Sequence, residues 1–146
     1  MIQFKPIIDS DITVIVKMMQ EFYAIDNYPI NPEISNSLFQ EFIADKNLGK
    51  AWLIISDDVV VGYVILTFIF SFEFQGKIAF LDELSEKARG KGIGNQAVAF
   101  IIEESQKLSL KLIYLEIENH NQNAQKLYIA SGFELHNRKL MAYKTR

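Results

Sequence analysis

Apolar and polar residues follow two different periods in the first third of this chain, and the periods separate strands from helices. Alternation predicts a strand over residues 1–8. Apolar residues at helical spacing predict helices over 12–23 and 32–45, and the prolines within 27–32 separate them. The polar residues 9–11 are suited to cap the first helix. This part of the chain therefore predicts one strand followed by two helices.

The middle of the chain is dominated by strand-like segments. Residues 50–56 and 59–74 are rich in β-branched and aromatic residues, and the two aspartates 57–58 between them predict a tight hairpin. Residues 75–76 predict the next turn and 77–84 the next strand. The apolar part of 59–74 is shorter than the ~20 residues that a membrane-spanning helix needs, so no membrane segment is expected.

In the last third of the chain, segments with helical spacing again alternate with a strand-like segment. Helical spacing over 93–108 and 121–131 encloses a predicted strand over 111–118, and Gly132 is suited to end the second helix. Residues 133–143 predict one or two closing strands. Hairpins combined with a strand–helix–strand unit predict an α/β fold with a single mixed, mostly antiparallel sheet flanked by helices.

Composition narrows the classes of protein to which this chain can belong. A length of 146 residues predicts a single domain over 1–146, and a net charge of −3 argues against a nucleic-acid-binding protein. With no cysteine and only two histidines, neither a metal site nor a covalent cysteine intermediate is expected. No signal peptide is evident, which favours a cytoplasmic protein without a membrane partner. The long apolar strands leave open an edge-paired or strand-exchanged homodimer.

A glycine-rich, basic segment lies between a predicted strand and a predicted helix. Residues 89–94 read Arg-Gly-Lys-Gly-Ile-Gly and contain three glycines and two cations. Glycines allow a ligand to approach the backbone closely, and the following helix start offers unpaired N–H groups to an anion. The segment therefore predicts a pyrophosphate site, with an ordinary basic surface turn as the alternative.

Two other phosphate-binding motifs do not fit this segment. A P-loop requires Gly-Lys followed by Ser or Thr, which does not occur in the chain. A dinucleotide-binding motif requires Gly-x-Gly-x-x-Gly directly after a strand, whereas a polar spacer over 85–89 precedes the glycines here.

Two motifs together resemble the GNAT superfamily of acyl-CoA-dependent N-acetyltransferases. The first is Arg-x-x-Gly-x-Gly, with Arg89, Gly92 and Gly94 as its fixed positions. The second is Asn-x-x-Ala-x-x-Leu-Tyr-x-x-x-Gly-Phe, which begins at Asn121 and ends at Phe133. The order and separation of the two motifs are those of the family, and the detailed resemblance covers residues 59–144.

The resemblance implies acetyl-CoA as cofactor, with CoA as product, and assigns its contacts to particular residues. The implied cofactor-binding residues are Leu84, Ser85, Arg89, Gly90, Lys91, Gly92, Ile93, Gly94, Asn95, Asn121, Asn123, Ala124, Lys126 and Tyr128. The loop amides would hold the pyrophosphate, and the main chain of Leu84 and Ser85 would pair with the pantetheine arm as an added strand does. Compared with the family, the spacer before the loop is about two residues short. For Asn121 a plain helix N-cap is the alternative role.

The same resemblance suggests how protons move during acyl transfer. Tyr128 matches the position whose phenol (pKa ~10) protonates the departing thiolate of CoA (thiol pKa ~8.5); packing against the sheet is its alternative role. Glu83 is the preferred base or amine anchor, followed by Asp82 and then Glu116. As neighbours on a strand, Asp82 and Glu83 are expected to point to opposite faces. A salt bridge from one of them to Lys77 or Arg89, or loss of the proton directly to water, remains an alternative.

The predicted function is transfer of an acetyl group from acetyl-CoA to a primary amine of a small molecule or peptide, directly within a ternary complex. Candidate acceptor-binding residues are Tyr28, Glu83 and Glu116. Carboxylates near the site suit a cationic acceptor such as a polyamine, an aminoglycoside-like amine or a lysine side chain. A non-catalytic acyl-CoA-binding or sensing domain is the alternative, and a longer acyl chain is also open.

Overall fold

The computed structural model describes residues 1–87 and 90–145, and the chain divides into two compact units, Met1–Glu116 and Ile117–Arg146. The elements of the first unit are β1 (Ile2–Pro6), the 3₁₀ turn η1 (Asp9–Asp11), α1 (Ile12–Ile25), α2 (Pro32–Ala44), β2 (Gly49–Ser56), β3 (Val59–Ser71), β4 (Gly76–Glu86), α3 (Ile93–Lys107) and β5 (Ile113–Tyr114). The second unit contains α4 (Gln122–Ala130). The expectation of one domain over 1–146 stays a prediction.

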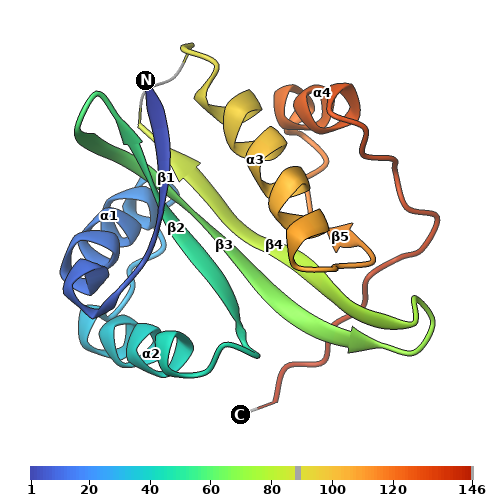
Figure 1. The fold of residues 1–146 in the computed structure, drawn as a ribbon, viewed down its shortest axis with the longest axis horizontal. Coiled ribbons are helices and arrows are strands. Elements are labelled where there is room, and N and C mark those ends of the chain that lie inside the picture. The colour runs from blue at the N-terminus through green and yellow to red at the C-terminus, as the bar shows by residue number, and fades with distance from the viewer. Residues whose placement is uncertain (88–89, 146) are drawn as a thin grey trace. The chain divides into compact units, whose positions relative to one another are not determined.

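The first unit is built on one sheet whose strands lie in the order β1-β2-β3-β4-β5. Each of the first four strands pairs antiparallel with its neighbour, and β5 pairs parallel with β4. The predicted mixed, mostly antiparallel sheet flanked by helices is therefore confirmed (Figure 1). The hairpin between β2 and β3 turns at Asp57 and Asp58, both with left-handed φ (48° and 68°), as a two-residue hairpin turn requires.

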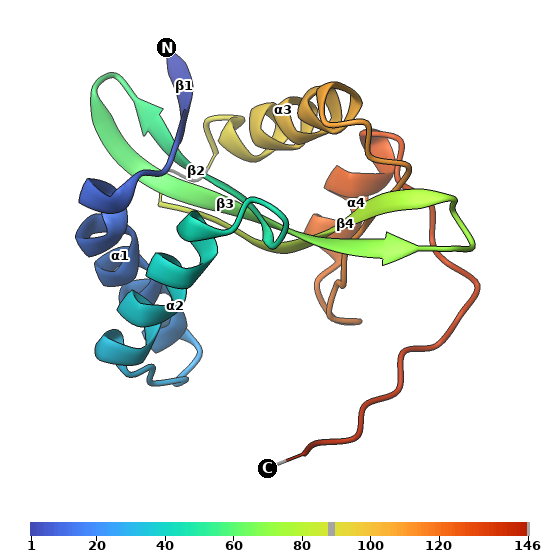
Figure 2. The same ribbon diagram turned by 60° about the horizontal axis from the view of Figure 1, so that its bottom comes forward.

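The two faces of the sheet are covered by different helices. Alternation along β2 places Ala51 and Leu53 on the face of the sheet that α1 and α2 cover, within the core. The alternate residues Trp52 and Ile54 belong to the other face: Ile54 packs against α3, and the ring of Trp52 meets Phe100 of α3 edge-on at 5.2 Å. In Figure 2, α1 and α2 lie below the sheet and α3 lies above it. Sequence alternation therefore decides which side chains each helix covers.

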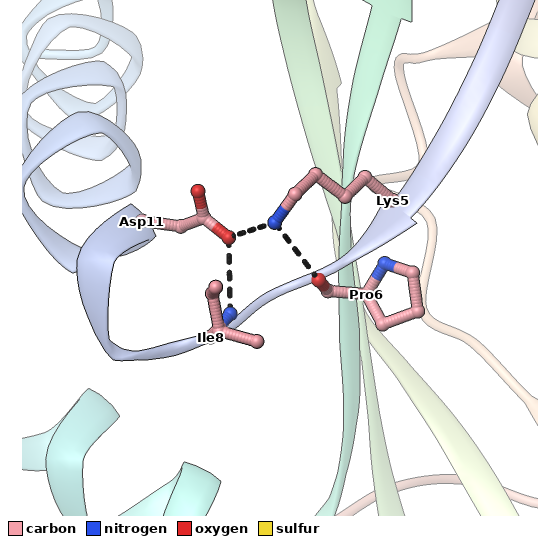
Figure 3. Close-up of polar contacts among 4 residues, drawn as sticks. All are labelled: Lys5, Pro6, Ile8 and Asp11. Carbon is pink, nitrogen blue, oxygen red and sulfur yellow. Dashed lines mark hydrogen bonds and ion pairs between the residues drawn. The ribbon is translucent and has the colours of Figure 1, made fainter.

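A polar junction fixes the path from β1 into α1 (Figure 3). The Asp11 carboxylate accepts hydrogen bonds from the Ile8 backbone N–H, at 3.0 Å, and from the Lys5 ammonium. Burial alone would raise the pKa of Asp11, but the hydrogen bonds from Lys5 and Ile8 and the charge of Lys5 outweigh it and lower that pKa. Asp11 thus ties back to the preceding turn, and its side chain does not cap α1 as the sequence had suggested.

Several strand limits differ from those the sequence predicted. β3 ends at Ser71 because a turn over 72–75 begins there, closed by a hydrogen bond from the Phe74 N–H to Ser71 Oγ at 3.1 Å. β4 extends beyond the predicted limits at both ends, since its whole length to Glu86 pairs with β3. β5 is only Ile113–Tyr114, because it meets β4 at Ala79 and Phe80 alone.

The closing strands predicted over 133–143 are absent from the described part of the second unit. Leu135, Leu140, Met141 and Tyr143 are all exposed there. Alternating apolar residues predict a segment that can pair, but a strand forms only where a partner edge supplies the hydrogen bonds. Within the described residues, no helix is long and apolar enough to cross a membrane.

Candidate active site

Glu83 accepts hydrogen bonds from two tyrosines that belong to different elements. The Tyr23 hydroxyl of α1 donates to Oε2 at 2.6 Å, and the Tyr63 hydroxyl of β3 donates to Oε1 at 2.8 Å. Tyr63 is fully buried, while Glu83 and Tyr23 are half-buried. Each carboxylate oxygen therefore has one fixed donor and keeps acceptor capacity for a further group.

Burial and the neighbouring charges perturb the acidities of all three groups. Burial raises the pKa of Glu83, the two tyrosine hydrogen bonds offset part of this rise, and the charge of Asp82 adds to it. Burial, followed by the interactions with Glu83, raises the pKa of Tyr23 and of Tyr63 far above that of a free phenol. The tyrosines therefore stay protonated as donors. Glu83 is the group of the three that can exchange a proton during turnover.

A β-bulge in β4 brings the second carboxylate toward the same place. Leu81 pairs with Leu66 and Glu83 pairs with Ile65, so Asp82 is the extra residue of the bulge. The prediction that Asp82 and Glu83 point to opposite faces of the sheet is wrong. Strict alternation ends at the bulge, and both residues line one pocket. Burial raises the pKa of Asp82 as well.

This pocket lies where α1 and α2 cover the sheet and has a volume of about 430 Å³. Its lining residues are Met19, Tyr23, Ile30, Asn31, Ile34, Ser35, Leu38, Phe39, Phe42, Ile65, Thr67, Asp82 and Glu83. Most of the lining is apolar, and the carboxylates of Asp82 and Glu83 bring negative charge to it. A pocket of this size and composition is suited to a small molecule.

The glycine loop leads directly into α3. Gly90 (φ 81°) and Gly92 (φ 72°) both adopt left-handed backbone, and a Cβ at either position would meet no atom of the described residues within 4 Å. The helix ladder begins with the Gln96 N–H bonded to the Gly92 carbonyl, so the N–H groups of Ile93, Gly94 and Asn95 lie outside it. The helix dipole adds partial positive charge at this end.

These features fit a pyrophosphate, because space unfilled by the described residues, amide donors outside the helix ladder and positive potential coincide at the start of α3. Gly92 is the N-cap residue, and a glycine has no side chain that could occupy these amides. Lys91 is exposed beside them. The predicted cation Arg89, and Ala88 at the end of the short spacer, lie outside the described residues.

β4 changes its pairing along its length. On one side, Leu84 and Ser85 pair with Val64 and Tyr63 of β3. On the other side, β5 contacts β4 only near Ala79, before the bulge. In the described part of the first unit, the backbone of β4 beyond the bulge therefore has an edge with which an extended ligand can pair.

The second unit orders the residues of the downstream motif around α4. The Asn121 side chain caps α4 by accepting from the Ala124 N–H at 3.1 Å, which is the alternative role foreseen for it. At the other end, Phe133 N–H bonds to the Tyr128 carbonyl and Gly132 N–H to the Ile129 carbonyl. This Schellman arrangement uses the left-handed Gly132 (φ 106°) and ends the helix as the sequence predicted.

The Tyr128 ring packs edge-on against Phe133, with ring centroids 5.5 Å apart, and burial raises the pKa of its phenol. The Tyr128 phenol is therefore protonated across the neutral range. Of the other predicted cofactor contacts on α4, Asn123 and Lys126 are exposed and Ala124 is half-buried.

The family model for the acetyltransferase (GNAT) family matches residues 16–133 of this chain. The chain belongs to the GNAT acetyltransferase family. It is therefore an acyltransferase, which decides between the enzyme and the non-catalytic binding domain in favour of the enzyme.

This GNAT acetyltransferase is similar to both curated and structurally characterised proteins. It is 25% identical over 125 residues to D-amino-acid N-acetyltransferase HPA3 of Saccharomyces cerevisiae, covering 81% of this chain and 76% of the relative. Its fold matches integron cassette protein HFX_CASS3 from the mobile metagenome of Cole Harbour Salt Marsh with a TM-score of 0.89 and 27% identity, covering 99% of this chain and 91% of that chain.

A predicted acetyltransferase of Clostridium acetobutylicum, solved with acetyl-CoA, matches the acetyltransferase with a TM-score of 0.80 and 16% identity. That comparison covers 98% of this chain and 96% of that chain, and it shows a shared fold.

Two of the predicted acceptor-binding residues lie outside the pocket of this acetyltransferase. Tyr28 is 67% exposed in the turn after α1, where its N–H bonds to the Tyr23 carbonyl. Glu116 is exposed at the end of the first unit. Neither is among the residues that line the pocket of Glu83. The third, Glu83, lines it.

The sequence did not indicate Tyr63, and the alternative of a salt bridge from a carboxylate to Lys77 is not what the structure has at Glu83. The Lys77 ammonium lies over the ring of Phe68, 4.8 Å from its centroid, whereas the Glu83 carboxylate bonds to Tyr23 and Tyr63. The sequence signal for Tyr63 is weak, because it is one of three hydroxyl-bearing residues, with Thr67 and Ser71, in a mostly apolar strand. Its pairing with Glu83 depends on the β3–β4 register, which the sequence does not reveal.

Proposed function

We propose that this acetyltransferase moves an acetyl group from acetyl-CoA to a primary amine of a small molecule or peptide, by direct transfer within a ternary complex. The observation that carries this proposal is the Glu83 carboxylate. It lines a pocket beneath α1 and α2 and belongs to the strand that leads toward the glycine loop. The curated relative from yeast, named as an acetyltransferase of D-amino acids, also suggests an amine acceptor.

Acetyl-CoA supplies the thioester whose acyl group is transferred. The amides that begin α3, together with Gly90 and Gly92, would hold its pyrophosphate, and Leu84 and Ser85 would pair with its pantetheine arm. Asn121, Asn123, Ala124 and Lys126 are proposed as further contacts from α4, by their match to the family motif. Lys91 and Arg89 would add full positive charges at the loop.

Protons are proposed to pass through two side chains. Glu83 accepts a proton from the bound ammonium and leaves the amine lone pair free to attack. The Tyr23 and Tyr63 hydroxyls hold the carboxylate in place while it does so. Tyr128 donates its phenolic proton to the sulfur that leaves and regains one, through water, from the amine nitrogen, which must lose a second proton to become an amide. The proton on Glu83 afterwards passes to water. Since the chain has no cysteine, a cysteine-bound acyl intermediate is not available.

The direct-transfer proposal is tested by initial rates measured with both substrates varied. We expect CoA to appear only when an amine is present, together with a stoichiometric N-acetylated product found by mass spectrometry. Double-reciprocal lines should intersect, as a ternary complex requires. Parallel lines, or release of CoA without an acetylated amine, would contradict direct transfer.

Tyr128→Phe removes only the phenolic oxygen and keeps the ring that packs on Phe133. We expect kcat to fall by about 10²-fold, the lower end of the range for general acid catalysis, while the acetyl-CoA Kd stays within about twofold. Stopped-assay kinetics and calorimetric titration measure the two quantities. Tyr143→Phe is the matched control, since Tyr143 belongs to the same unit and is 90% exposed. Unchanged turnover in Tyr128→Phe would remove the acid role.

A further inference from the structure

The pocket lined by Asp82 and Glu83, where the amine is proposed to bind, restricts the acceptor more than membership of the family does. Among the described residues that line it, the ionisable ones are the carboxylates Asp82 and Glu83 and the phenol Tyr23, and none is a lysine, arginine or histidine. A ligand that carries its own carboxylate would find no cation here and would face two like charges. Such an unpaired, partly desolvated charge is strongly unfavourable.

The wall that α2 contributes is mostly apolar, including where it reaches solvent, and its polar members Asn31 and Ser35 carry no charge. Ile34 and Leu38 line the pocket from α2 and are 60% and 58% exposed, positions at which a surface helix ordinarily carries polar residues. Phe39 and Phe42 continue the same wall deeper in. A second cation on the ligand would lie against this wall without a partner, whereas an alkyl or aryl group would cover Ile34 and Leu38.

We infer that the acceptor is an apolar monoamine: one primary amine on an alkyl or aryl body, without a carboxylate and without a second cation. This inference rests on the proposed function and narrows its substrate class. The ammonium lies against Glu83 and Asp82, and the body lies along α2. Of the acceptors open from the sequence, polyamines and aminoglycoside-like amines fit this pocket poorly.

Two matched pairs of amines test the inference. Phenethylamine and phenylalanine, the latter as both D and L forms, differ only in the carboxylate, and butylamine and 1,4-diaminobutane differ only in the second amine. We expect kcat/KM for phenethylamine to exceed that for either phenylalanine by about 10²-fold. Butylamine should exceed 1,4-diaminobutane by about tenfold. Equal or reversed preferences in both pairs would overturn the inference while leaving acetyl transfer established.

A pair of adjacent substitutions links the preference to this wall. Leu38→Lys places a cation on the pocket lining, and Ser37→Lys places the same charge one residue away, outside the lining. Both side chains are exposed, so both variants should fold. Leu38→Lys should lower kcat/KM for phenethylamine by about tenfold and narrow the discrimination against phenylalanine. Ser37→Lys should change neither. Equal effects of the two variants would contradict a specific role of the wall.

Binding measurements separate the inference from the proposed function. If no amine is acetylated, phenethylamine is titrated calorimetrically into the wild-type protein and both variants. Binding that Leu38→Lys weakens by about tenfold and Ser37→Lys preserves supports the pocket's preference and counts against the proposed transfer. No phenethylamine binding to the wild-type protein overturns the inference itself.

Discussion

Glu83→Gln should lower kcat by about 10²- to 10⁴-fold, the range expected when a general base is lost. The substitution keeps the size of the side chain and its ability to accept from Tyr23 or Tyr63, but it removes the only group of that cluster able to take a proton. Steady-state kinetics with phenethylamine as acceptor measure the effect. A loss confined to KM would instead assign Glu83 to amine binding.

The pH dependence gives the same variant a second readout. Burial raises the pKa of Glu83, so in the wild-type enzyme the carboxyl group is protonated, and inactive as a base, to a higher pH than an exposed glutamate. The rate should therefore rise with pH through this raised pKa. Glu83→Gln should lose that acidic limb of the profile. If the limb survives, it belongs to ionisation of the amine itself or to another carboxylate.

Asp82→Asn is the matched control, because Asp82 lines the same pocket one residue away and its pKa is also raised by burial. We expect this variant to keep the acidic limb, shifted slightly to lower pH because the charge that raises the Glu83 pKa is gone. Loss of the limb in Asp82→Asn, with its retention in Glu83→Gln, would transfer the base role to Asp82.

Thermal unfolding shows whether Glu83→Gln acts through stability. A carboxyl group whose pKa is higher in the folded state binds protons more tightly there, so its contribution to stability is present at low pH and lost as the pH rises through the folded pKa. A neutral glutamine does not carry that loss. The variant should therefore unfold no earlier than the wild type at neutral pH, and a markedly lower Tm would mean that Glu83 is structural.

Gly92→Glu should abolish detectable acetyl-CoA binding, a loss of at least about 10²-fold in affinity. Gly92 is the N-cap of α3, where the amides of the first turn lie outside the helix ladder and can meet an anion. A glutamate there would satisfy those amides with its own carboxylate and repel the phosphates. Calorimetric titration with acetyl-CoA, with CoA and NAD alongside, measures the change.

Gly92→Ala separates the added charge from backbone strain. With φ at 72°, any side chain at this position costs roughly 1–2 kcal/mol, but the space around the position is open. Alanine should therefore lower stability slightly and weaken acetyl-CoA binding by less than about tenfold. If Gly92→Ala is as damaging as Gly92→Glu, the conformation of the loop matters more than its charge. If Gly92→Glu still binds acetyl-CoA, the pyrophosphate lies elsewhere.

Local signals were sufficient wherever the structure depends on neighbours along the chain. Helical spacing located α1, α2, α3 and α4 to within about two residues, because an amphipathic helix records its buried face in its own sequence. Gly92 and Gly132 were identified as loop and cap positions, and both adopt the left-handed backbone that glycine permits. The family assignment followed from the same local motifs.

Strand ends and strand partners were predicted less well, for a physical reason. A strand is defined by the ladder it joins, so Ile113–Tyr114 is short and 133–143 is irregular although both sequences are compatible with longer strands. The bulge at Asp82 depends equally on the partner strand. The extra residue there brings both carboxylates to one pocket, whereas strict alternation would place them on opposite faces of the sheet.

The sequence by itself determined the order of the elements from β1 to α4, the glycine loop before α3, the family and the candidate carboxylates, because each is written in the local pattern of residues. Only the tertiary structure decided that Tyr23 and Tyr63 hold Glu83 and that α2 gives the pocket an apolar wall. The two hydrogen bonds join Glu83 to tyrosines that lie 60 and 20 positions earlier in the chain. They arise from strand register and helix packing, which the free energy of the whole fold selects and no local segment encodes.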